Sequence, residues 1–227
     1  MKRVIAFDAD DTLWENEPLF RAAERRWTEI LSDYGTHEEL SAALYDVEGV
    51  NMKILGYGAK AFTMSLFETS LKVTGGKVTG EQVKGILEAG KSLLYNPATP
   101  LPGVEETLQK LSSSGKYLMV LLTKGDLLDQ ERKLERSGLG KYFDKVVIVS
   151  NKTEAEYRRL CSELGIGIGE LTMVGNSLKS DIKPVTDLGG RGIFIPFRIT
   201  WEHERIDEFE SPLLTKISSF DQLPDVL

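Results

Sequence analysis

The sequence is poor in the side chains that crosslink proteins or bind metals through nitrogen and sulfur. Its single cysteine, Cys161, cannot form a disulfide within the chain, which fits a reducing compartment. We expect this thiol to be buried and structural. The two histidines, His37 and His203, lie far apart in the sequence and indicate no histidine metal site. We expect both to be exposed to solvent.

Long hydrophobic runs are also missing. The apolar run Val4–Phe7 ends at Asp8, so it is too short for the core of a signal peptide. A later run, Tyr117–Leu122, falls far short of the ~20 residues that a membrane helix needs. We therefore expect a cytoplasmic protein that does not bind membranes.

Positive charge is scarcer than negative charge. The chain of 227 residues has 28 Lys and Arg against 35 Asp and Glu, a formal net charge of −7. Nucleic-acid binding requires a positive surface, so we expect no nucleic-acid partner. A metal cation or a metal-bound anion suits this charge better. Nothing in the sequence indicates the oligomeric state.

Five short apolar runs predict strands, and each is continuous, which is typical of strands buried on both faces. The runs are Val4–Phe7, Tyr117–Leu122, Val146–Val149, Leu171–Val174 and Gly192–Ile195. Helical patterns separate the later runs. One of them follows Thr153–Glu156, a segment that predicts a capping box. Strands that alternate with helices predict an α/β fold with a parallel sheet covered on both sides.

A large insert separates the first two predicted strands. They are about 110 residues apart, whereas the later ones are about 20 to 30 apart. The intervening residues have helical patterns, and Thr36 with Glu39 and Thr79 with Gln82 predict capping boxes. We therefore expect a catalytic core of residues 1–15 and 98–227, interrupted by a helical cap domain of residues 16–97.

Polar residues follow the predicted strands where each strand ends. In open parallel sheets, ligands bind outside the carboxyl ends of the strands, so we expect these residues to lie together. They are Asp8, Asp10, Asp11 and Thr12 after the first strand, Thr123 and Lys124 after the second, Lys152 after the third, and Gly175–Asp181 after the fourth.

Such a cluster of carboxylates needs a cation. Two carboxylates ~4 Å apart repel by roughly 4 kcal/mol at an effective dielectric constant near 20. Mg²⁺ fits because it takes few carboxylates and binds substrate phosphate. An aspartate beside a cation can attack phosphorus, and a second carboxyl can move protons. A lysine and a hydroxyl can bind the oxygens on which charge develops during phosphoryl transfer.

Four segments in this order resemble the motifs of the haloacid dehalogenase superfamily. They are DADDT (Asp8–Thr12), LLT (Leu121–Thr123), Lys152 and GNSLKSD (Gly175–Asp181). The resemblance covers essentially the whole chain, including the helical insert, the LPGV segment before the core resumes, and a short C-terminal strand and helix. It implies a Rossmannoid parallel sheet in three α/β/α layers with an inserted α-helical cap.

The resemblance also implies catalytic roles by position. Asp8 is expected to be the nucleophile that forms an aspartyl-phosphate, and Asp10 the general acid and base. Thr123 would bind the phosphoryl group, and Lys152 would neutralise the nucleophile and the phosphate. The residues expected to hold Mg²⁺ are Asp8, Asp10 through its backbone carbonyl, Asn176 and Asp181.

Two positions differ from the family pattern. Asp11 stands where glycine is common, and we expect its side chain to turn away and cap the turn. Asn176 stands where aspartate is usual, and we expect it to weaken Mg²⁺ binding without abolishing it. Thr12, Lys124 and Lys60 are expected to contact the substrate, Lys60 from a flexible segment of the cap.

These residues favour phosphate ester hydrolysis but leave other functions open. Dehalogenases of the superfamily lack the second acid that Asp10 provides. A phosphosugar mutase stays open, because nothing distinguishes transfer to water from transfer to a hydroxyl group. A receiver-like phosphate-binding module would carry an aspartate after the third strand, where Ser150–Lys152 stands instead. We expect a small phosphorylated metabolite as substrate, since a cap excludes water. Sugar phosphates, phosphoglycolate and nucleoside monophosphates all remain candidates.

Overall fold

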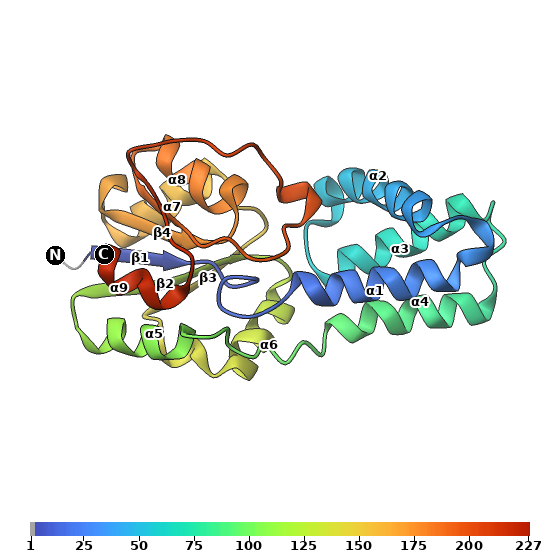
Figure 1. Ribbon diagram of the computed structural model, residues 1–227, viewed down its shortest axis with the longest axis horizontal. Helices are drawn as coiled ribbons and strands as arrows, with labels where there is room; N and C mark the ends of the chain where they lie inside the picture. Colours follow the sequence, from blue (N-terminus) through green and yellow to red (C-terminus); the bar gives the residue numbers. More distant parts are fainter. Residues whose placement is uncertain (1–2) are drawn as a thin grey trace. The chain divides into compact units, whose positions relative to one another are not determined.

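The computed structural model describes residues 3–227 and divides the chain into two compact units. The sheet unit consists of residues 3–17 and Ala98–Leu227, and the helical unit is Pro18–Pro97. Figure 1 shows the sheet and its helices in the first unit and a group of helices in the second. That the helical unit acts as a cap stays a prediction.

The sheet unit contains six parallel strands in the order β3-β2-β1-β4-β5-β6. They are β1 (Arg3–Phe7), β2 (Tyr117–Lys124), β3 (Lys145–Val149), β4 (Leu171–Gly175), β5 (Arg191–Phe194) and β6 (Leu214–Lys216). Each of the five apolar runs forms a strand, with Ile195 just beyond the end of β5, which confirms the predicted parallel α/β fold. The edge strand β6 and helix α9 (Leu223–Val226) match the C-terminal strand and helix that the resemblance implies.

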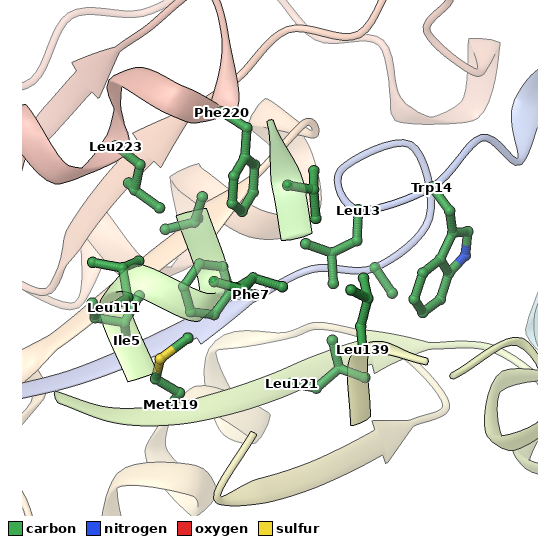
Figure 2. Close-up of a cluster of buried hydrophobic side chains, with 14 of the residues drawn as sticks. Ile5, Phe7, Leu13, Trp14, Leu111, Met119, Leu121, Leu139, Phe220 and Leu223 are labelled. Carbon is green, nitrogen blue, oxygen red and sulfur yellow. The ribbon is translucent and has the colours of Figure 1, made fainter. Parts of the chain in front are cut away.

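Alternate residues of β1 point to opposite faces of the sheet, and each face has its own core. Ile5 and Phe7 pack with residues of α5 (Val104–Ser113) and α9, and Figure 2 shows part of this cluster. Val4 and Ala6 pack with residues of α7 (Glu154–Leu164) and α8 (Lys183–Asp187). Burying each large apolar side chain contributes about 1.5–3 kcal/mol, so both helix layers are held onto the sheet. The result is a three-layer α/β/α arrangement.

Two local predictions in the sheet unit are wrong. The Thr153 side chain makes no capping hydrogen bond to α7. The Thr153 backbone carbonyl accepts the amides of Glu156 and Tyr157 at the start of this helix. His203 is half-buried rather than exposed, because its ring packs 5.0 Å from that of Trp201. The buried position of Cys161 is confirmed, and burial raises the pKa of its thiol.

The helical unit is held together by an apolar core. Its helices are α1 (Glu17–Ile30), α2 (His37–Leu55), α3 (Ala59–Val73) and α4 (Gly80–Leu93). Trp27 and Leu31 pack among apolar residues of the other three helices. Both predicted capping boxes, at Thr36 and Thr79, are confirmed. Within residues 3–227, none of the helices has the length and hydrophobicity that a membrane span requires.

Candidate active site

The loop after β1 places Asp8 at the centre of the sheet edge. β1 pairs with β2 on one side and β4 on the other, and the Asp8 amide donates to the Val174 carbonyl at 2.9 Å. The following turn holds Asp11 in the left-handed region, with a φ of 61°, a conformation that glycine adopts more easily than other residues. The expected role of Asp11 is confirmed, because its carboxylate accepts the amides of Asn16 and Glu17 at the start of α1.

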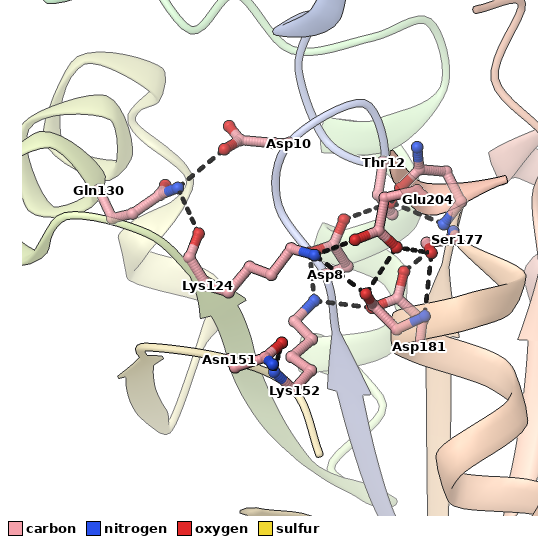
Figure 3. Close-up of polar contacts among 12 residues, drawn as sticks. Asp8, Asp10, Thr12, Lys124, Gln130, Asn151, Lys152, Ser177, Asp181 and Glu204 are labelled. Carbon is pink, nitrogen blue, oxygen red and sulfur yellow. Dashed lines mark hydrogen bonds and ion pairs between the residues drawn. The ribbon is translucent and has the colours of Figure 1, made fainter. Parts of the chain in front are cut away.

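Lys152 joins two carboxylates at the bottom of the site (Figure 3). Its ammonium contacts Asp8 and lies 2.7 Å from Asp181 Oδ1. All three side chains are buried, so the charges interact through little water. Burial would lower the pKa of Lys152, but Asp181 and Asp8 outweigh it and raise that pKa. The site therefore has two carboxylates, Asp8 and Asp181, paired with one ammonium group, that of Lys152.

Neighbouring residues fix Asp181 in place. The Ser177 amide donates to Asp181 Oδ2 at 3.0 Å. A Cβ at Gly175 would lie 2.3 Å from the same oxygen, so glycine at the end of β4 lets the carboxylate approach the strand. Burial, and next the charge of Asp8, raises the pKa of Asp181 to about 7 against the opposing effect of Lys152.

The residues around Asp8 fit a magnesium ion. One terminal atom of the Asn176 amide lies 3.2 Å from Asp8 Oδ2 and 3.3 Å from the Asp10 carbonyl oxygen. Hydrogen bonding alone favours the amide nitrogen at that position, whereas a bound cation would favour the amide oxygen. The oxygen would then lie from Asp8 Oδ2 and from the Asp10 carbonyl at about the spacing of neighbouring ligands in an Mg²⁺ octahedron of ~2.0–2.1 Å radius. Residues 3–227 hold no cluster of three or more His, Cys, Asp or Glu side chains that could bind a metal. The donor set therefore depends on amide and backbone oxygens as well as carboxylate, which suits a hard cation.

The Asp10 carboxylate points away from Asp8 in Figure 3. Lys133 Nζ lies 2.7 Å and 2.8 Å from its two oxygens, and Gln130 and Trp14 each donate to it at 2.8 Å. Burial opposes ionisation of Asp10, but Lys133, followed by these hydrogen bonds, leaves its pKa lowered. To donate a proton in the site, Asp10 must turn away from Lys133. Sequence reasoning missed Lys133 and Gln130, although two polar residues three apart on one face of α6 (Leu127–Ser137) were a signal.

The residues predicted to bind the phosphoryl group or the substrate lie in different parts of the structure. The Thr12 hydroxyl donates to Asp8 Oδ2 at 2.9 Å, and Thr123 is buried at the end of β2. Lys124 contacts Glu204, a residue that sequence reasoning missed because it lies in an irregular polar segment. Lys60 lies in α3 of the helical unit, so its contact with substrate stays a prediction.

This fold and this constellation define a class of hydrolase. A model of the haloacid dehalogenase-like hydrolase family matches residues 2–189, and the chain belongs to this family. A haloacid dehalogenase-like hydrolase from Xanthomonas campestris is 35% identical, with a TM-score of 0.88 over 99% of this chain and 90% of that one.

Two further relatives are more distant. Glyceraldehyde 3-phosphate phosphatase from Methanothermobacter thermautotrophicus is 26% identical over 100% of both chains. A magnesium-bound haloacid dehalogenase-like (HAD) hydrolase from Bacillus subtilis is 15% identical, with a TM-score of 0.70 over 99% of this chain and 98% of that one. At this identity, the second likeness concerns the fold alone.

Proposed function

We propose that the chain is a Mg²⁺-dependent phosphatase that hydrolyses a small phosphorylated metabolite through an aspartyl-phosphate on Asp8. The observation that carries this proposal is the buried Asp8–Lys152–Asp181 group beside the facing oxygens of Asn176 and Asp10. The relative that acts on glyceraldehyde 3-phosphate supports a phosphate ester as substrate. Because small phosphate esters are charged and stay in the compartment where they are made, we propose a cytoplasmic location.

Asp8 is oriented for in-line attack by two fixed donors. Lys152 holds Oδ1 and Thr12 holds Oδ2, so the plane of the carboxylate is set before substrate binds. Mg²⁺, held by Asp8, the Asp10 carbonyl and Asn176, with Asp181 in support, would neutralise charge on the phosphoryl oxygens. Lys152 and the Thr123 hydroxyl would bind the same group.

The proposed reaction has two steps. In the first, Asp10 has turned away from Lys133 and taken up a proton from solvent. An Asp8 oxygen bonds to phosphorus, the ester bond breaks, and Asp10 gives that proton to the leaving oxygen. In the second, Asp10 takes a proton from water, the water oxygen bonds to phosphorus, and the bond to Asp8 breaks. Inorganic phosphate leaves and Asp8 returns to its starting state.

The test is hydrolysis of 4-nitrophenyl phosphate with Mg²⁺ or with EDTA. We expect activity with Mg²⁺, almost none with EDTA, and loss of nearly all activity in Asp8→Asn. The matched control is Asp33→Asn, an exposed aspartate of the helical unit, which should keep full activity. A fully active, folded Asp8→Asn would overturn the proposal.

Further assays on the same protein distinguish a phosphatase from the three alternative functions. Halide release from a 2-haloacid without phosphatase activity would favour a dehalogenase, and stable labelling of Asp8 without turnover would favour a binding module. Transfer of phosphate to a phosphosugar rather than to water would favour a mutase. A panel of phosphate esters, including glyceraldehyde 3-phosphate, sugar phosphates, phosphoglycolate and nucleoside monophosphates, would identify the substrate.

A further inference from the structure

A segment between β5 and β6, residues 195–213, brings an acidic side chain to the site. Its residue Glu204 is half-buried, with 12% of its side chain exposed, and its carboxylate accepts three hydrogen bonds. The donors are Lys124, Ser177 and Ser180. Lys179 makes a second contact with this segment, because its ammonium donates to the His203 carbonyl at 2.7 Å. Glu204 is thus held in one position rather than extended into solvent.

The partners of Glu204 place it beside the residues of the proposed active site. Each of the three donors is next in sequence to a residue of the proposed site. These neighbours are Thr123, Asn176 and Asp181. The Lys124 ammonium also donates to Ser180 at 3.0 Å and lies 5.9 Å from the centre of the Trp201 ring. Figure 3 shows Lys124 extending from the end of β2 toward Glu204 across the site.

The charge of Glu204 determines whether Lys124 can attract an anionic group of the substrate. A lysine one residue after a phosphate-binding threonine would attract a second anionic group on the substrate. Glu204 faces that lysine at contact distance and cancels its charge. Burial opposes ionisation of Glu204, but Lys124 outweighs it and leaves the pKa of Glu204 lowered, so the carboxylate is charged at neutral pH.

Since a substrate anion near Lys124 would meet the Glu204 carboxylate as well, we propose that Glu204 is a specificity-determining residue. By neutralising Lys124, it makes the site select phosphate esters whose remainder is uncharged over those that carry a second anionic group. This inference rests on the proposed phosphatase function and narrows its substrate class.

The test compares two esters that share three carbons and one phosphate. Glycerol 3-phosphate has a terminal hydroxymethyl group where 3-phosphoglycerate has a carboxylate. We expect the unaltered chain to have the higher kcat/KM for glycerol 3-phosphate. Glu204→Gln should raise the relative kcat/KM for 3-phosphoglycerate about tenfold, which is about 1.4 kcal/mol. Because both esters are measured on one preparation, partial unfolding of a variant does not change this ratio.

Three further variants separate charge from structure. Glu204→Asp keeps the charge and should keep the preference of the unaltered chain. Glu202→Gln removes an exposed carboxylate of the same segment, paired with Arg205 at 3.1 Å, and should leave the ratio unchanged. In the double variant Glu204→Gln/Lys124→Gln, the relative kcat/KM for 3-phosphoglycerate should return to that of the unaltered chain, since its increase requires the lysine charge.

The outcomes distinguish this inference from the function on which it rests. Hydrolysis of both esters with the same ratio in Glu204→Gln and Glu202→Gln would overturn the role of Glu204 alone. If the unaltered chain hydrolysed neither these esters nor 4-nitrophenyl phosphate, the proposed function would fail and this inference with it.

Discussion

Buried charges at single positions dominate the chemistry of the sheet unit. Lys133 has only 3% of its side chain exposed, and its ammonium is held against both oxygens of Asp10. A buried pair of this kind adds little net stability, but removal of one partner is costly because the other charge remains buried. The general acid of the proposed reaction is therefore also a structural counter-ion.

The first prediction concerns this pair. Asp10→Ala should lower the free energy of unfolding by about 1–3 kcal/mol, because the buried Lys133 ammonium then keeps only weaker partners among those described, Asn16 at 3.2 Å and Asp129 at 3.8 Å. The double variant Asp10→Ala/Lys133→Met should recover most of this loss. Both are measured by urea denaturation, with Asp33→Ala as an exposed control. Equal stability of Asp10→Ala and the unaltered chain would contradict the proposed cost of the buried ammonium.

A second prediction concerns Asn176. Asn176→Asp adds a charge beside Asp8 Oδ2 and the Asp10 carbonyl, so it should lower the half-saturating Mg²⁺ concentration about tenfold, or about 1.4 kcal/mol. In EDTA the same variant should melt at a lower temperature, because three carboxylates then share the Lys152 cation. An unchanged Mg²⁺ dependence in both activity and melting would show that Asn176 does not face the ion.

Among the secondary-structure elements, helices α3 and α4 make a close contact at a glycine. A Cβ at Gly90 of α4 would lie 2.1 Å from Thr63 Oγ1 and 2.8 Å from Thr63 Cβ on α3. The absence of a side chain at Gly90 lets the two helices approach each other. Since Cβ of Thr63 cannot move without the backbone, an added methyl group would push the helices apart.

The third prediction tests this contact. Gly90→Ala should destabilise the chain by about 1–3 kcal/mol through overpacking, although alanine favours a helix by about 1 kcal/mol. Gly80→Ala is the matched control, because it lies in the same helix and its Cβ would meet nothing within 4 Å. Thermal unfolding of both variants gives the comparison. A Gly90→Ala variant as stable as Gly80→Ala would contradict the predicted clash.

At the scale of the whole molecule, stability depends on carboxyl groups that folding makes harder to ionise. Burial, and next the charge of Asp10, raises the pKa of Asp11 from 3.8 to about 8, against the hydrogen bonds from Asn16 and Glu17. The folded chain therefore binds more protons than the unfolded chain between these two values. Stability from this group is present at low pH and is lost as the pH rises toward 8.

The fourth prediction follows from this loss of stability with rising pH. In EDTA, the free energy of unfolding should fall between pH 5 and pH 8, as the buried carboxyl groups of Asp11 and Asp181 ionise. Asp11→Asn keeps an oxygen that accepts the amides at the start of α1 but cannot ionise. It should therefore flatten the profile and be more stable than the unaltered chain at pH 8, by at least about 1.4 kcal/mol. Parallel profiles for the two chains would exclude Asp11 as the titrating group.

The order of the elements could be predicted from local patterns. Apolar runs such as Val4–Phe7 are typical of strands buried on both faces, and the boxes at Thr36 and Thr79 needed only residues three apart. The capping box at Thr153 was predicted from the same kind of pattern, but its side chain makes no capping hydrogen bond. Local patterns predict elements well, but they do not determine every side-chain contact.

The sequence by itself determined the parallel α/β fold, the family, and the set of polar residues that follow the strands, because these depend on neighbouring residues and on the direction of parallel strands. The tertiary structure alone decided that Asp10 faces Lys133 and that Lys124 faces Glu204. These pairs join residues 123 and 80 positions apart. Their formation depends on the packing of α6 and of the segment between β5 and β6, which no local pattern encodes.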